Sequence, residues 1–138
     1  MLCLSLRAGP QAATDVAPSL RIQILNGMTG RPVANRHLVL IRKDGRRLEG
    51  NGAGKTTDGE GYAAIPNADV ALSDVVVSVD LYRPCSKTGK HEFSLVKVRG
   101  AGVVSENSCR SRITLFPQAG TLIFFVREET FLEKMRRR

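Results

Sequence analysis

Tryptophan is absent from the 138-residue sequence, and aromatic residues of all kinds make up only 5% of it. A core must therefore be built from aliphatic side chains, and runs rich in valine, isoleucine and leucine favour strands. Cysteine occurs only at Cys3, Cys85 and Cys109, with no Cys-x-x-Cys or Cys/His spacing typical of a zinc site. No apolar run approaches the roughly 20 residues that a membrane-spanning helix needs.

The sequence also lacks any arrangement of residues that specifies a reaction. The only two histidines are His37, inside an expected strand, and His91, and neither has a serine, cysteine or carboxylate spaced to work with it. Asp69, Asp74 and Asp80 do not follow the alternating pattern of a calcium loop. We therefore expect no catalytic residue, no metal site and no cofactor.

The glycine-rich segment GNGAGKTTDGEGY, residues 50–62, raises the question of a nucleotide-binding P-loop. Gly54, Lys55 and Thr56 fit the end of that motif, but Glu49 occupies the position of its first glycine. The two further glycines and the proline that follow exclude the helix that a P-loop requires. The segment instead predicts a turn, in which Asp58-Gly59 and Glu60-Gly61 supply positive φ angles for a hairpin.

Short apolar segments recur about every ten residues between turn signals such as NGMTGRP and DGRR. This spacing, without a long helical period, predicts an all-β antiparallel sandwich of seven to eight strands over residues 19–128. The expected strands lie within residues 19–27, 36–43, 61–67, 74–83, 91–100, 110–117 and 120–128, with a further short one near Thr56 and Thr57. In 74–83 the alternation places Val75, Val77, Val79 and Leu81 on the inner face, and in 91–100 it does the same, less regularly, for Phe93, Leu95 and Val98.

The basic segment 129–138 predicts a short amphipathic helix. Thr130 and Glu133 have the spacing of a capping box, and Glu133 can pair with Arg137 one turn later. A helix this short is marginal alone, so its apolar side would lie on the sheets, on a partner or on a membrane. Alternatively, the segment is only solvated charge. The candidate docking residues are Phe131, Met135, Arg136, Arg137 and Arg138.

Net charge is +8, which favours anionic partners such as an acidic protein, a polysaccharide or an anionic membrane surface. Nucleic acid is disfavoured because exposed aromatics and recognised binding motifs are missing. A basic cluster is the candidate patch for an anionic partner, although such a cluster also serves to keep a sheet edge from aggregating. Its members are Arg36, Arg42, Lys43, Arg46 and Arg47.

Residues 1–18 form a leader whose apolar part, Met1–Leu6, is shorter than a signal-peptide core of about 7–15 residues. The small residues after it would suit a cleavage site, so the leader is either the rear half of an export signal or a disordered segment. Without it, Cys85 and Cys109 remain as an even pair. We expect them to form a disulfide bond at one end of the sandwich, which indicates an extracytoplasmic protein.

Residues 20–66 carry a series of short motifs: Thr29-Gly30-Arg31-Pro32-Val33, then Leu38-Val39-Leu40, then Thr57-Asp58-Gly59-Glu60-Gly61-Tyr62. The series resembles the carboxypeptidase regulatory-like domains, which are similar in fold to transthyretin and to adhesin repeat modules. The resemblance implies an Ig-like or transthyretin-like β-sandwich that acts as a non-catalytic binding or structural module. The alternatives left open are an accessory domain or subunit of an envelope enzyme or complex, and a basic nucleic-acid-associated protein.

Overall fold

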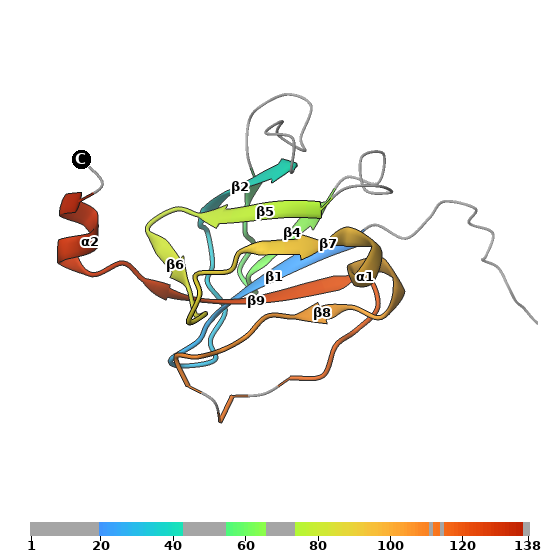
Figure 1. Cartoon of the computed structure of the whole chain (residues 1–138). Coiled ribbons are helices and arrows are strands. Elements are labelled where there is room, and N and C mark those ends of the chain that lie inside the picture. The colour runs from blue at the N-terminus through green and yellow to red at the C-terminus, as the bar shows by residue number, and fades with distance from the viewer. Residues whose placement is uncertain (1–19, 43–54, 66–73, 111, 114, 137–138) are drawn as a thin grey trace, which may run out of the picture.

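The computed structural model describes residues 20–42, 55–65, 74–110, 112–113 and 115–136 (Figure 1). These residues form mainly strands, arranged in two sheets, with two short helices. The predicted all-β class is therefore confirmed.

The first sheet has the strand order β4-β1-β9-β6, and β8 also pairs with β9. Its strands are β1 (Leu20–Asn26), β4 (Tyr62–Ile65), β6 (Tyr82–Pro84), β8 (Val103–Val104) and β9 (Thr121–Glu128). β1 runs parallel to β9, as does β8, whereas the other two pairings are antiparallel. The sheet is thus mixed rather than purely antiparallel. β1 and β9 are the first and last of the described strands, so no hairpin turn in the sequence reveals their pairing.

The second sheet has the order β3-β2-β5-β7, and all its pairings are antiparallel. Its strands are β2 (His37–Arg42), β3 (Lys55–Thr56), β5 (Asp74–Val79) and β7 (Glu92–Ser94). The longest contact joins β2 to β5, with Leu38 opposite Val79 and Leu40 opposite Val77. Alternate side chains of both strands are buried, as the period of two in the sequence predicts.

The main core collects inward-facing side chains from both sheets. Phe93 and Phe124, one from each sheet, meet edge to face with ring centroids 5.2 Å apart. Every second residue of β1 and β9 points into this core. Several of the residues between them face the other side of the first sheet and belong to a second buried cluster. That cluster contains Leu25, Cys85, Ile123 and Phe125. β9 is consequently buried on both faces along most of its length, which explains why its sequence LIFFV, after the buried Thr121, is continuously apolar.

Two expected strands are wrong. Within 91–100, only Glu92–Ser94 is a strand, and Leu95–Gly100 forms the helix α1. Leu95 and Val98 are both buried at the i, i+3 spacing of a helix, and the Ser94 side chain caps α1 by accepting a hydrogen bond from the Lys97 amide. Within 110–117, the described residues form no strand at all.

A third expected strand, residues 74–83, is broken. Leu81 has a φ of +66° and lies in a tight turn between β5 and β6, so the chain passes there from one sheet to the other. Val75, Val77 and Val79 face the core as predicted, whereas Leu81 is only half-buried.

The turn at Asp58–Gly61 likewise joins the two sheets and is not the hairpin expected from the sequence. β3 before it pairs with β2 in one sheet, and β4 after it pairs with β1 in the other. Gly61 has the predicted positive φ, of +82°, but Gly59 does not.

Several sequence predictions fall outside the described residues. These are the leader at 1–18, the start of the glycine-rich segment at 49–54, Asp69, three members of the basic cluster (Lys43, Arg46 and Arg47), and Arg137 with Arg138.

Candidate binding surface

In the described part of the glycine-rich segment, the side chains of Thr57 and Asp58 form hydrogen bonds with backbone groups. The Thr57 side chain is buried, donates to the Val33 carbonyl at 2.7 Å and accepts from the Arg36 amide at 3.0 Å. The Asp58 carboxylate accepts hydrogen bonds from the amides of Glu60 and Tyr62. A strand follows this turn, not a helix, so the turn interpretation is confirmed for residues 55–65.

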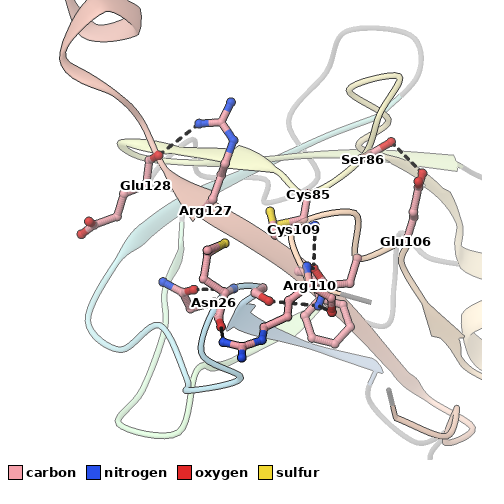
Figure 2. The surroundings of a disulfide bond; sticks show 12 residues. Asn26, Cys85, Ser86, Glu106, Cys109, Arg110, Arg127 and Glu128 are labelled. Carbon is pink, nitrogen blue, oxygen red and sulfur yellow. Dashed lines mark hydrogen bonds between the residues drawn. A yellow bond between two sulfur atoms is a disulfide. The ribbon is translucent and has the colours of Figure 1, made fainter. Parts of the chain in front are cut away.

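Cys85 and Cys109 form the predicted disulfide bond, with their Cα atoms 5.3 Å apart (Figure 2). Cys85 directly follows β6, and Cys109 lies in the segment between β8 and β9. The bond rests on Gly27 at the end of β1, where any side chain would collide with the Cys85 sulfur and with Asn107. It therefore ties this segment to the outer face of the first sheet.

Hydrogen bonds hold the cysteine segment in addition to the disulfide. The Asn107 amide donates to the carbonyls of Gly27 and Arg110, and its oxygen accepts from the Cys109 amide. Ser108 donates from its amide to the Cys85 carbonyl at 2.8 Å. The segment is thus a fixed part of the scaffold and presents Arg110 at the surface.

The helix α2 (Phe131–Arg136) has the predicted capping box. The Thr130 amide donates to Glu133 Oε1 at 2.9 Å, and the Glu133 amide donates to Thr130 Oγ1 at 3.2 Å. Figure 1 shows α2 standing away from the two sheets, beyond the end of β9. None of its residues is buried, so Phe131 and Met135 do not lie on the sheets.

A bidentate ion pair joins α2 to β9. The two terminal nitrogens of Arg127 donate to the two carboxylate oxygens of Glu133 at 2.9 and 2.8 Å. These bonds, with the Thr130 amide, lower the pKa of Glu133 from 4.5 to about 2. Among the described residues, the partner of Glu133 is therefore Arg127; Arg137, with which the sequence predicted a pair, lies outside them. The Glu133 carboxylate stays ionised throughout the neutral range.

A cleft of about 520 Å³ opens between β5, β6, β9 and the loop at 84–91. Its floor is apolar and includes Val79 and Phe124, and its rim carries Lys87, His91 and Glu133. The loop that forms one wall is folded around Ser86, whose hydroxyl accepts from the amides of Thr88 and Lys90 and donates to Glu106. The cleft therefore lies between the loop and the base of α2.

The basic cluster is only partly within the described residues. Arg36 and Arg42 are both half-buried, and the Arg36 guanidinium lies over the Tyr82 ring, 5.6 Å from its centroid. Arg36 thus helps to pack the edge of the two sheets. An anionic-partner patch at this cluster stays a prediction.

Two exposed features were missed from the sequence because their residues were assigned to strand interiors or left unassigned. Phe116 is 90% exposed and Leu115 is 42% exposed, in the segment taken for a strand. Lys87 and Lys90 stand exposed on the loop at 84–91. A signal for the first was present in Pro117, since a proline directly after two apolar residues disfavours a central strand.

Among the described residues, no group of three or more histidine, cysteine, aspartate or glutamate side chains is placed to hold a metal ion. No described helix is long and apolar enough to cross a membrane. A scan against protein-family models found no match, and searches of curated proteins and of solved structures found none either. The resemblance to carboxypeptidase regulatory-like domains therefore stays a prediction.

Proposed function

We propose that this protein is a non-catalytic binding or structural module that works outside the cytoplasm. The observation that carries the proposal is the set of large apolar side chains displayed on two elements outside the core, α2 and the segment with Leu115 and Phe116. Apolar side chains gathered at the surface of a soluble domain mark a site of interaction. They stand on a scaffold that a disulfide and two packed clusters hold in shape.

The finer fold that we propose is an Ig-like or transthyretin-like sandwich of the carboxypeptidase regulatory-like kind. Support comes from the core that the two sheets share and from the positions of the sequence motifs, which connect one sheet to the other. The Thr29–Val33 motif leads from β1 in one sheet towards β2 in the other, and the Thr57–Tyr62 motif leads back. Motifs that turn the chain between two sheets are what a sandwich needs from its connections.

The location outside the cytoplasm is supported by the disulfide. Structural disulfides form and persist in oxidising compartments and are rare where thiols are kept reduced. The Cys85–Cys109 bond encloses a loop of 24 residues and would stabilise the fold by about 3–4 kcal/mol in the chain-entropy treatment. Losing that contribution in a reducing compartment would remove a large share of the 5–15 kcal/mol typical of a domain.

Site-specific photo-crosslinking in the native host tests the binding function. A photoreactive phenylalanine replaces Phe116 in one variant and Phe131 in another, and both side chains are exposed enough to accept it without disturbing the core. We expect at least one of the two positions to give discrete adducts after irradiation.

The matched control places the same probe at Thr56, an exposed residue of β3 remote in sequence from both elements. Adducts at Phe116 or Phe131 but not at Thr56 support a binding surface. The same faint smear at all three positions would contradict it. If the adduct is an envelope enzyme, the chain acts as that enzyme's accessory subunit, which is the alternative that the sequence left open.

A further inference from the structure

α2 has an apolar side that nothing in the described chain covers. Phe131, Leu132 and Met135 are 74%, 64% and 56% exposed. The helix is held out from the sheets by its capping box and by the Arg127–Glu133 pair (Figure 1). Three large apolar side chains are therefore presented at a fixed place instead of folding back onto the core.

The charged side chains of α2 beside this apolar side are mainly cationic. α2 contains Lys134 and Arg136, and Arg137 and Arg138 follow directly in the sequence. The only acidic residue of α2 is Glu133, and both of its carboxylate oxygens are engaged by Arg127. The element thus combines an apolar side with cationic residues whose charge no acid of the helix offsets.

A second basic element lies on the same side of the molecule. Lys87, on the exposed loop at 84–91, lines the cleft that Glu133 of α2 also lines, and Lys90 follows three residues later. The Ser86 hydrogen bonds fold this loop, and the adjacent disulfide at Cys85 fixes its start. The loop therefore adds the cationic side chain of Lys87 to the surface around α2, and the exposed Lys90 adds to the positive charge of the same loop.

We propose that α2 and the loop at 84–91 together dock the protein on an anionic lipid surface. The apolar side chains of α2 enter the boundary between headgroups and acyl chains. The exposed Lys134 and Arg136 of α2 and Lys87 and Lys90 of the loop lie over the anionic headgroups. The combination of a modest apolar contact and a basic patch is what reversible membrane attachment requires, since one signal alone binds weakly.

The length of α2 favours lipid over an acidic protein groove. A helix recognised in a groove displays anchors at i, i+3, i+4 and i+7, which takes more than two turns. α2 has six residues and offers anchors only over one turn. A lipid interface has no fixed pockets and demands only apolar area and positive charge. This proposal names a partner for the binding module proposed above and so rests on it.

Vesicle co-sedimentation of the full chain tests the proposal. Vesicles of phosphatidylcholine alone are compared with vesicles containing 30% phosphatidylglycerol, at low and at physiological salt. We expect binding to the anionic vesicles only, weakening as salt rises. The double variant Phe131→Ala/Leu132→Ala should lower the partition constant more than tenfold. Lys87→Ala/Lys90→Ala should lower it about fivefold for each lysine removed.

Val96→Ala is the control, because it trims an exposed apolar residue of α1 that lies outside α2, the loop at 84–91 and the segment with Leu115 and Phe116. It should leave the partition constant unchanged, and circular dichroism should show every variant folded. Equal binding to neutral vesicles, or a Val96→Ala loss as large as that of the α2 variant, would overturn the proposal. The absence of binding to anionic vesicles would also overturn it. If photo-crosslinks at Phe131 then lead to an acidic protein, the lipid proposal fails but the proposed binding function is supported.

Discussion

Gly61 occupies a place in the turn between the sheets that no other residue fits. Its φ is +82°, and a Cβ atom added there would lie 2.5 Å from the Ile24 carbonyl oxygen. Its own carbonyl accepts from the Ile24 amide at 2.8 Å, so the backbone cannot move away without losing a bond of the first sheet. Gly59, two residues earlier, has no atom within 4 Å of the same added Cβ.

Gly61→Ala is therefore expected to destabilise the protein by about 2 kcal/mol or more, through strain at the positive φ and the contact with the Ile24 carbonyl. Gly59→Ala should change the free energy of unfolding by no more than about 0.5 kcal/mol. Urea unfolding of the two variants beside the unchanged chain measures both. Equal effects of the two substitutions would show that the close approach at Gly61 is not real.

For single residues, the sequence predicted which side chains are buried better than it predicted backbone φ angles. The alternation in residues 74–79 correctly placed Val75, Val77 and Val79 in the core. It could not predict the break at Leu81, because a leucine at a φ of +66° is held by the crossing between sheets and not by its own preference. Of the two glycines expected to have positive φ, only Gly61 does.

Among the elements, α2 is attached to β9 by an electrostatic pair. The Arg127 guanidinium and the Thr130 amide hold the Glu133 carboxylate and lower its pKa to about 2. Because the pKa is lower in the folded state, the stabilisation is present above about pH 4.5 and is lost as the pH falls towards 2.

We expect the Glu133 carboxyl carbon, followed by NMR, to titrate with a midpoint near 2, and the Thr130 amide signal to move with the same midpoint. In Glu133→Gln the Thr130 signal should lack this transition and stay constant over the range. A Glu133 midpoint close to 4.5 would contradict the ion pair and would leave α2 without its attachment to β9.

The α1 segment shows where pattern reasoning failed for an element. Phe93, Leu95 and Val98 are all buried, as predicted, but the last two belong to a helix. Over ten residues an apolar set at i, i+2 and i+5 fits a loose strand as well as a strand followed by one helical turn. The capping box at Thr130 was predicted correctly, because two side chains at a fixed spacing define it without tertiary contacts.

For the molecule as a whole, the closing feature is the parallel pairing of β1 with β9, which places the first and last described strands side by side in the first sheet. The sequence predicted both strands but not their pairing, since residues 100 positions apart leave no local mark of contact. The disulfide was predictable because only two cysteines remain without the leader. The conformation of the segment that carries Cys109 could not be predicted, because residues 110–117 were expected to form a strand.

The candidate surface could be predicted from the sequence only in part, for a similar reason. The apolar and basic residues of α2 are visible in a ten-residue stretch. The lysines of the loop at 84–91 join them only through the folding of β5, β6 and β9 around one cleft. A surface assembled from separate segments requires the tertiary structure, whereas one carried by a single helix does not.

We propose that the protein is a disulfide-closed scaffold that works outside the cytoplasm. The most direct test blocks free thiols at the moment of lysis in the native host and then determines the intact mass and the Cys85–Cys109 peptide. We predict that both cysteines resist alkylation until a reductant is added, and that the two peptides are recovered linked. Recovery of Cys85 and Cys109 as two alkylated thiols, without reductant, would contradict the claim.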